Sequence, residues 1–130
     1  MYGVFTVENK GSGEFRTFEI REMPEDSKFA PGQTVLSLLT GPSNSHDYRG
    51  FAFIGNGVKV WKKCRSEDGD PPSDYEYFAQ MFERLVLSED SSWLEKYEIH
   101  EAIPCRRCGE QLTVPKSIRA GVGPVCAQKE

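Results

Sequence analysis

Three cysteines have the spacing of metal ligands. Cys105 and Cys108 are separated by two residues and followed by Gly109, and seventeen residues separate Cys108 from Cys126. Thiolates bind Zn²⁺ in a tetrahedron at about 2.3 Å. A two-residue gap lets two thiolates reach one ion, and Gly109 can adopt the positive φ of the tight turn that follows. The spacing therefore predicts a zinc site built on Cys105, Cys108 and Cys126.

A tetrahedral structural site needs a fourth ligand, and the sequence leaves its identity open. His100, five residues before Cys105, is the nearest candidate. Cys64 could reach the site from the preceding strands, Glu110 could supply an oxygen, and a water molecule or no further side chain is also compatible. Redox chemistry fits less well, because a redox Cys-x-x-Cys pair normally opens a helix in a thioredoxin-like βαβ unit, which this sequence lacks.

The residues between the cysteines predict a small fold around the metal. Leu112-Thr113-Val114 can form a short strand, and residues 115–120 can make one helical turn. Residues 121–124 then turn the chain into a last helix that starts with a proline and carries Cys126. A knuckle, a hairpin and a ligand-bearing helix in this order are typical of a treble-clef finger. Residues 104–130 are therefore predicted to form a treble-clef-like zinc module.

The same segment resembles an uncharacterised protein family. The shared residues are Cys105-Arg-Arg-Cys-Gly, Leu112-Thr113, Pro115, Ser117-Ile118, Gly121, Gly123-Pro124 and Cys126. They follow the signature C-x-x-C-G-x-x-L-T-x-P-x-S-I-x-x-G-x-G-P-x-C of a domain of unknown function in bacteriophage and bacterial, often actinobacterial, proteins. Residues 29–51 are also similar to the region that precedes this module in some members. The resemblance implies zinc and a phage or prophage setting, and it implies no reaction because the family has no assigned activity.

The predicted module is basic, although the whole sequence has a formal net charge of −4. Such asymmetry indicates an anionic partner. The glycine-containing turn at 121–124 also resembles a helix-hairpin-helix turn, in which backbone N–H groups and a helix N-terminus grip a phosphate. Alternatively, its glycines simply permit the turn. The predicted nucleic-acid contacts of the module are Arg106, Arg107, Lys116, Arg119, Gly121 and Gly123.

A second basic group is predicted on a strand. Lys59, Trp61 and Lys63 alternate along the sequence and would share one face of that strand. A basic strand with a central aromatic side chain is suited to stack and neutralise single-stranded nucleic acid. Alternatively, Trp61 packs beneath the helix predicted at 74–87, with the lysine stems along its edges.

Residues 1–65 are predicted to form a small five-stranded antiparallel β-barrel or curled sheet. Alternating apolar residues between glycine and proline turns indicate the strands. The expected strands are 4–7, 15–20, 34–39, 51–54 and 58–61.

The hairpin within this region has a specific expected register. Asn56-Gly57 favours a two-residue type I′ turn, which pairs Phe53 with Val60 and Ala52 with Trp61. This register turns four side chains toward the core: Phe51, Phe53, Val58 and Val60.

Residues 66–103 are predicted to contain a loop and two helices that pack on the sheet. Ser73 and Glu76 form a capping box at the start of a helix over residues 74–87, whose apolar residues recur at helical spacing. Ser92 repeats the capping signal and opens a shorter helix. Together with the zinc module, these elements predict an α+β fold.

The sequence shows no recognisable catalytic arrangement. It has two histidines in total, and it lacks a phosphate loop and a His-x-x-x-His pair. Three thiolates with an open fourth position could activate water, but no deaminase-like His-x-Glu motif accompanies them. We therefore expect a non-enzymatic protein without a small-molecule substrate.

Two classes of partner follow from the charge pattern. The first is nucleic acid, contacted by a phage-type accessory protein through its basic module. The second is a host or anti-phage defence protein, inhibited or modulated through an acidic N-terminal domain; the acidic face would include Glu67, Asp68, Asp70 and Asp74. The sequence has no apolar run long enough for a membrane span and no signal-peptide pattern, so we expect a cytoplasmic location (the host cytoplasm if phage-encoded), where disulfides are rare.

Overall fold

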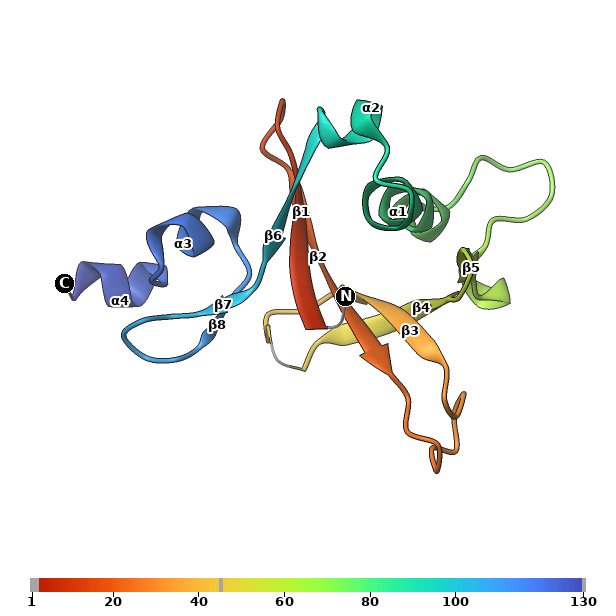
Figure 1. Ribbon diagram of the computed structural model, residues 1–130, viewed down its shortest axis with the longest axis horizontal. Helices are drawn as coiled ribbons and strands as arrows, with labels where there is room; N and C mark the ends of the chain where they lie inside the picture. The colour runs from red at the N-terminus through yellow and green to blue at the C-terminus, as the bar shows by residue number, and fades with distance from the viewer. Residues whose placement is uncertain (1–2, 45, 130) are drawn as a thin grey trace.

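A six-stranded antiparallel sheet forms the centre of the protein. The computed structural model describes residues 3–44 and 46–129. The strand order is β5-β4-β3-β2-β1-β6, so the sheet is open, with β5 and β6 at its edges (Figure 1). The strands are β1 (Gly3–Asn9), β2 (Phe15–Glu22), β3 (Thr34–Leu39), β4 (Tyr48–Ile54), β5 (Val58–Val60) and β6 (Tyr97–Glu101). The prediction of an α+β fold is confirmed, whereas a closed barrel of five strands is wrong.

The sixth strand comes from the region where the sequence predicts only a loop and helices. β6 pairs antiparallel with β1, and His100 lies opposite Thr6. Tyr97 and Ile99 contact the core beneath α1, whereas Glu98 and His100 lie together on the opposite face, as the alternation of a strand requires. This alternating pattern was visible in the sequence.

The β4–β5 hairpin differs from its predicted register by one residue. Phe53 lies opposite Lys59, and Ala52 lies opposite Val60. The loop has three residues, because Gly55 joins the turn and its N–H donates to the carbonyl of Gly57. Such a shift reverses which face a side chain occupies.

A bulge in β4 modifies this reversal. The register between β3 and β4 shifts at Leu36/Ser37, so Phe51 is the extra residue of β4. Phe51 therefore still reaches the core with Ala52, while Phe53 turns to the opposite face, where it contacts Trp61. Of the four side chains predicted to face the core, only Phe53 does not.

One face of the sheet is covered by α1 (Asp74–Phe82), which continues as a π-helical turn over Glu83–Leu87. The predicted capping box of Ser73 and Glu76 is present at its start. Aromatic rings fill the space between this helix and the sheet, and the ring pairs include Phe5–Phe82, Phe18–Phe78 and Phe51–Tyr75. The shorter helix α2 (Ser91–Leu94) is capped by Asp90, whose carboxylate accepts from the N–H of Ser92.

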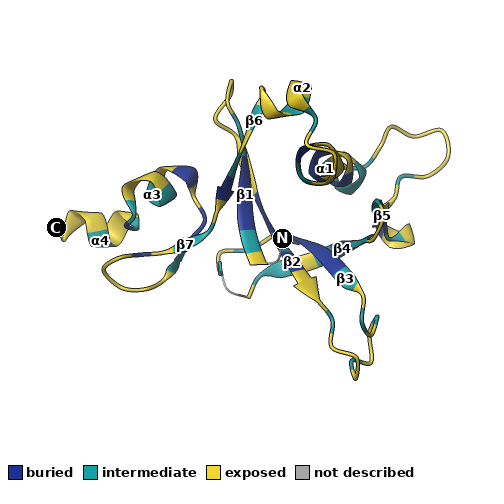
Figure 2. Ribbon diagram, viewed as in Figure 1, coloured by how far each residue is buried: buried dark blue, intermediate teal, exposed yellow. Residues whose placement is uncertain are grey.

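The opposite face carries the C-terminal module at its β1 end. The module consists of β7 (Ile103–Pro104), β8 (Gln111–Leu112), α3 (Pro115–Ala120) and α4 (Pro124–Gln128). Figure 1 shows α1 and this module on opposite sides of β1 and β6. Burial is concentrated beneath α1 and along β1 (Figure 2). In the described residues, no helix is long and apolar enough to cross a membrane.

Polar contacts join the module to the sheet. The hydroxyl of Thr6 is fully buried, donates to the carbonyl oxygen of Thr113 and lies 2.8 Å from the hydroxyl of Thr17. Beside it, the side-chain amide of Gln111 donates to the carbonyl of Asn44 at 2.7 Å, and the amide of Asn44 donates back to the carbonyl of Gln111 at 3.3 Å. Because buried polar groups need partners, these contacts fix the position of the module.

Replacing the Thr6 hydroxyl should therefore weaken the whole fold. Thr6→Val keeps the shape of the side chain but leaves the Thr113 carbonyl and the Thr17 hydroxyl without their partner. We expect the free energy of unfolding to fall by about 1–3 kcal/mol in equilibrium denaturation. Thr40→Val is the matched control, because the Thr40 hydroxyl makes its hydrogen bond to Asp47 at an exposed site. Equal effects of the two substitutions would contradict the role given to Thr6.

Candidate metal centre

Three thiols converge at one point of the module. The sulfur atoms of Cys105, Cys108 and Cys126 all lie within 4.8 Å of one another. Cys105 precedes the turn between β7 and β8, Cys108 lies in that turn, and Cys126 lies in the first turn of α4. Zinc–sulfur bonds of about 2.3 Å in a tetrahedron place sulfurs roughly 3.8 Å apart, which this cluster accommodates. The predicted cysteines are thus together in a geometry compatible with a metal ion.

The backbone around Cys105 favours its thiolate form. The N–H groups of Cys108, Gly123 and Arg107 donate to its sulfur and lower the pKa of the thiol to about 6, although burial acts in the opposite direction. Metal-bound thiolates depend on such surrounding hydrogen bonds, which orient the ligand and spread its charge. The residues present therefore fit a cation at this site.

Cys126 shows the complementary effect. Its hydrogen bond to the sulfur of Cys108, its burial and the nearby charge of Cys105 raise the pKa of its thiol to about 11. Three thiolates in contact repel one another, so the last proton is hard to remove without a positive charge between them. A divalent cation supplies that charge.

None of the three side chains considered as a fourth ligand, His100, Cys64 and Glu110, is grouped with the three thiols. His100 is on β6, where its Nε2 lies 2.9 Å from the carboxylate of Glu8, in a separate group that also contains Glu98. The pairing of β6 with β1 brings His100 to this carboxylate instead. Cys64 is buried in the main core beneath α1. Among the described residues, no fourth Cys, His, Asp or Glu joins the cluster.

The two glycines of the predicted phosphate-binding turn have structural roles. Gly121 has φ of +77°, caps the end of α3 and donates its N–H to the carbonyls of Ser117 and Ile118. Gly123 directs its N–H at the sulfur of Cys105. These donors are already used within the module, so the glycine turn offers them to no phosphate.

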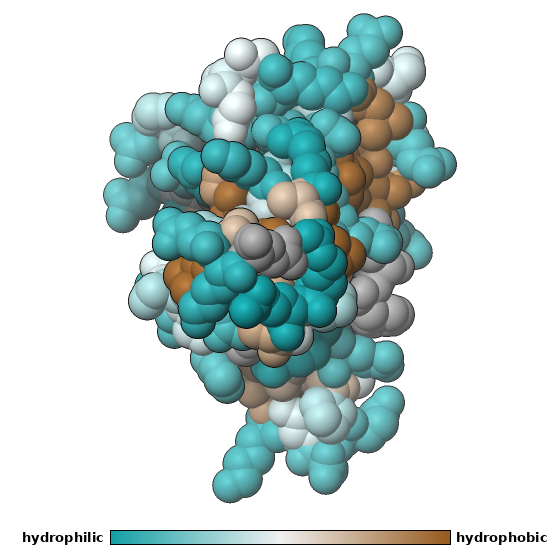
Figure 3. Space-filling view, turned by 90° about the vertical axis from the view of Figure 1, so that its left-hand side faces the viewer, coloured by the Kyte–Doolittle hydropathy of each residue, from teal (hydrophilic) through white to brown (hydrophobic). Residues whose placement is uncertain are grey.

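The arginines of the module are also partly engaged. Arg106 donates to the carbonyl of Ala120 at 2.6 Å, and Arg107 donates to the carbonyl of Lys129 at 3.1 Å. Both arginines and Lys116 nevertheless remain exposed. Figure 3 looks at the side of the molecule that carries α3 and α4, where hydrophilic residues cover most of the surface.

Arg119 is paired with carboxylates of the sheet, although its side chain is 54% exposed. Its guanidinium contacts the carboxylate of Glu8 on β1 and lies 3.7 Å from that of Glu98 on β6. Hydrogen bonds from His100 and Arg119 hold the pKa of the Glu8 carboxyl below its usual range, against the effect of burial. Glu8 on β1 therefore contacts both Arg119 of the module and His100 on β6, and this role was not predictable from charge alone.

Trp61 lies on the same face of the sheet as the module, at its other end. Its ring packs over Gly50, where a Cβ atom would approach within 2.7 Å, and against Phe53 and Phe29. Its position therefore differs from the alternative expected beneath α1. The indole nitrogen is buried without a hydrogen-bond partner among the described groups, so ring packing holds Trp61 in place.

The three rings border a hollow of about 400 Å³, which we call the aromatic cleft. Its remaining border includes the basic side chains of Lys59, Lys62, Lys63 and Arg65. Lys63 lies over the Trp61 ring, with its Nζ 5.3 Å from the ring centroid. The structure thus brings together the predicted Lys59, Trp61 and Lys63 and adds Phe29, Phe53, Lys62 and Arg65. The concentration of basic residues at 59–65 indicates this site in the sequence, whereas no local sequence pattern connects Phe29 with it.

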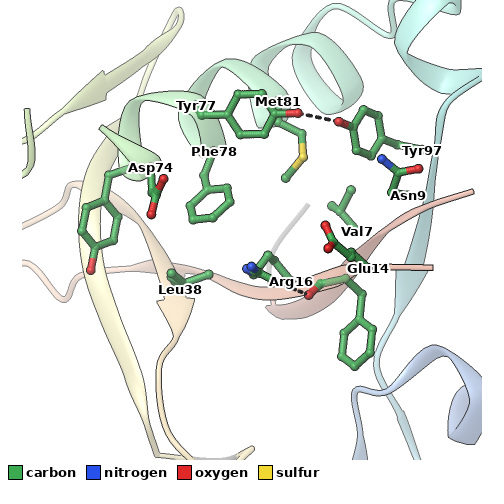
Figure 4. Close-up of a pocket in the computed structure, with 12 residues that line it drawn as sticks. Val7, Asn9, Glu14, Arg16, Leu38, Asp74, Tyr77, Phe78, Met81 and Tyr97 are labelled. Carbon is green, nitrogen blue, oxygen red and sulfur yellow. Dashed lines mark hydrogen bonds between the residues drawn. The ribbon is translucent and has the colours of Figure 1, made fainter. Parts of the chain in front are cut away.

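A second hollow lies between α1 and the β1–β2 hairpin (Figure 4). It has a volume of about 430 Å³, and its charged lining consists of Arg16, Glu14 and Asp74. The hydroxyls of Tyr77 and Tyr97 are hydrogen-bonded at its edge, and this bond, with burial, raises the pKa of Tyr97 to about 12. The lining combines charges of both signs, so it selects neither an anion nor a cation.

Comparison with known proteins bears on the module. A model described as a family of unknown function (DUF6011) matches residues 104–130. No curated protein and no solved structure matches the chain. The matched segment contains all three clustered cysteines, so the resemblance of this segment to an uncharacterised domain is confirmed.

The contact between Glu8 and the module makes stability depend on pH in a defined direction. The pKa of Glu8 is lowered in the folded state, so its contribution to stability is present above the ordinary carboxyl value of 4.5 and is lost as the pH falls through the folded value. Glu8→Gln should reduce the free energy of unfolding at pH 7, and the difference from the wild type should shrink below pH 4.5. Urea denaturation over this pH range measures it.

Glu14→Gln is the control for the loss of one carboxylate, because Glu14 lies on the exposed β1–β2 turn. It should alter the unfolding free energy less than Glu8→Gln at pH 7. A Glu8→Gln difference that grows as the pH falls would contradict the assigned ion pair.

Proposed function

We propose that this chain is a non-enzymatic, zinc-binding accessory protein that contacts the nucleic-acid backbone through its C-terminal module. The observation that supports it most directly is the convergence of three thiols in a module with exposed basic side chains. Zinc is the preferred ion because thiolate-rich tetrahedral sites of this kind suit zinc and because its coordination stabilises small folds that have little core of their own.

The small core of the module supports a structural role for the metal. Its buried cluster contains Cys105, Leu112 and Val122, with Ile103, Ile118 and Cys126 packed against it. Two of these six residues are themselves metal-ligand candidates. A module with so few apolar residues needs an additional source of stability, which metal coordination would supply.

The proposed backbone contact rests on Arg106, Arg107 and Lys116, with Arg119 excluded by its ion pairs to the sheet. The helices of the module have six and five residues, so neither is a long recognition helix for a DNA groove. Contacts to phosphate are therefore expected to dominate, which gives binding little sequence preference and a steep dependence on salt.

A protein partner is the second candidate function. Glu67, Asp68, Asp70 and Asp74 are all exposed on the segment before and at the start of α1. A concentration of carboxylates can bind a basic surface of a host or defence protein and can repel nucleic acid. A phage setting, proposed from the family resemblance, would fit either partner.

The metal proposal predicts one zinc ion per chain. Cys108→Ser should release the ion and unfold the module, because one of three thiolate ligands is lost. Elemental analysis measures the ion, and amide hydrogen exchange of residues 105–129 measures the unfolding. Cys64→Ala is the control, since Cys64 lies in the main core and should leave the metal content unchanged. Protein purified without chelator that contains no metal, or that has a Cys105–Cys108 disulfide, would refute the proposal.

The backbone proposal predicts a charge-dependent affinity. Arg107→Glu combined with Lys116→Glu should weaken binding to DNA or RNA by about 1–2 kcal/mol at low salt while the metal is retained. Fluorescence anisotropy with single- and double-stranded probes measures this. Lys10→Glu combined with Lys96→Glu makes the same change of charge near α2 and should have a smaller effect. No binding to any probe at about 100 µM would remove the nucleic-acid function and favour the protein partner.

A further inference from the structure

We propose that the aromatic cleft is a binding site for one unpaired base of a single-stranded nucleic acid and for its neighbouring phosphates. This inference rests on the proposed nucleic-acid function and specifies its ligand as single-stranded. It places base recognition on the sheet, at a site separate from the metal module.

The first argument is the exposed aromatic surface. The Phe29 ring is 50% exposed, although it is a large apolar side chain that contacts two other rings. It lies edge-on to Trp61 at a centroid distance of 5.3 Å and is stacked with Phe53 at 6.4 Å. Exposed aromatic side chains in a hollow provide the surfaces on which unpaired bases stack.

The second argument is the construction of the site around Trp61. Gly50 has no side chain, so the indole ring can lie against the strand, and Val35 contributes a methyl group 3.1 Å from the position that a Cβ of Gly50 would occupy. The adjoining strand β5 and the following 3-10 turn, Lys62–Cys64, then present the basic side chains around this ring. Trp61 and the four basic side chains therefore come from one continuous segment, residues 59–65, and Phe29 and Phe53 complete the aromatic surface from other parts of the chain.

The third argument is charge complementarity. Four basic side chains line the cleft, and none of its described lining residues is acidic, although the chain as a whole is acidic. The Nε of Arg65 donates to the carbonyl of Val60 at 2.8 Å, which holds its guanidinium beside the strand. A local cationic site on an acidic protein indicates an anionic ligand.

A nucleotide fits this combination better than an acidic peptide. Each nucleotide carries a planar base and a phosphate, so a short strand supplies both a ring for Phe29 and anions for the lysines. An acidic peptide supplies carboxylates on aliphatic side chains and no planar surface in each unit. In a duplex the bases are already stacked on their neighbours, so none is available to the cleft.

The experiment uses the full-length, metal-loaded chain and three labelled probes. These are a short oligothymidylate, an abasic oligonucleotide of the same length and a duplex of that length. Fluorescence anisotropy at low salt should show that the wild type binds oligothymidylate roughly fivefold or more tightly than the abasic strand. The duplex should also bind less tightly than the oligothymidylate.

Two substitutions of Phe29 separate the contribution of ring stacking to binding from any effect on folding. Phe29→Tyr keeps the ring and should bind oligothymidylate as the wild type does, whereas Phe29→Leu keeps an apolar side chain without a ring and should weaken it roughly fivefold or more. Both should bind the abasic strand equally. Phe15→Leu, at a comparably exposed phenylalanine on β2, is the matched control and should change nothing. Thermal unfolding verifies that all variants are folded.

The contribution of charge is tested separately. Lys63→Gln should lower the slope of log affinity against log salt by about one, whereas Lys96→Gln should not change it. Equal salt slopes for the wild type and Lys63→Gln would contradict a phosphate contact at the cleft.

The remaining outcomes are decisive in different ways. If the wild type binds nucleic acid but Phe29→Leu and Phe29→Tyr bind oligothymidylate equally, the cleft assignment is wrong and the proposed function stands. If no probe binds, both fail together. A glutamate-rich peptide would overturn the assignment in favour of a protein partner under two conditions. It would have to displace the oligonucleotide, and it would have to bind the Phe29→Tyr variant more tightly than the Phe29→Leu variant.

Discussion

The buried hydroxyl of Thr6 joins the two parts of this protein. It lies between the hydroxyl of Thr17 on β2 and the carbonyl of Thr113 in the module, and it has no access to solvent. A buried hydroxyl without hydrogen-bond partners is costly. The module must therefore lie at one position on the sheet for the polar groups of both parts to find their partners. The ion pairs of Arg119 and the exchange of hydrogen bonds between Asn44 and Gln111 also join the module to the rest of the chain and depend on the same alignment.

The sheet is covered differently on its two faces. Aromatic and aliphatic side chains join it to α1, so that contact is held by the burial of apolar surface. The hydroxyl of Thr6 and the carboxylates paired with Arg119 join it to the module, so that contact is directional. The cysteine cluster is therefore held at a fixed position relative to the sheet, and the basic side chains of the module are presented from a defined direction.

Local patterns in the sequence predicted much of this structure. Five strand positions, the capping box at Ser73 and the helix from residue 74 all follow from periodicity and turn chemistry. The three thiols were predictable because their spacing is itself the signal. Features that depend on distant residues were not predictable: the bulge at Phe51 depends on its pairing with β3, and the partner of Arg119 lies 111 residues away in sequence. Charge composition marked Arg119 as available to a ligand, but it could not show that Arg119 pairs with Glu8.

The contact between Thr6 and Thr113 also constrains the order of folding, because 107 positions separate the two residues. A ribosome releases β1 and β2 well before it releases the segment that covers them. Until then, the hydroxyls of Thr6 and Thr17 on this face are exposed to water, while α1 can already cover the other face. Such a long-range contact has a high entropic cost of loop closure, which slows the step that forms it. Docking of the module is therefore expected to be the last event in folding, after β6 has paired with β1.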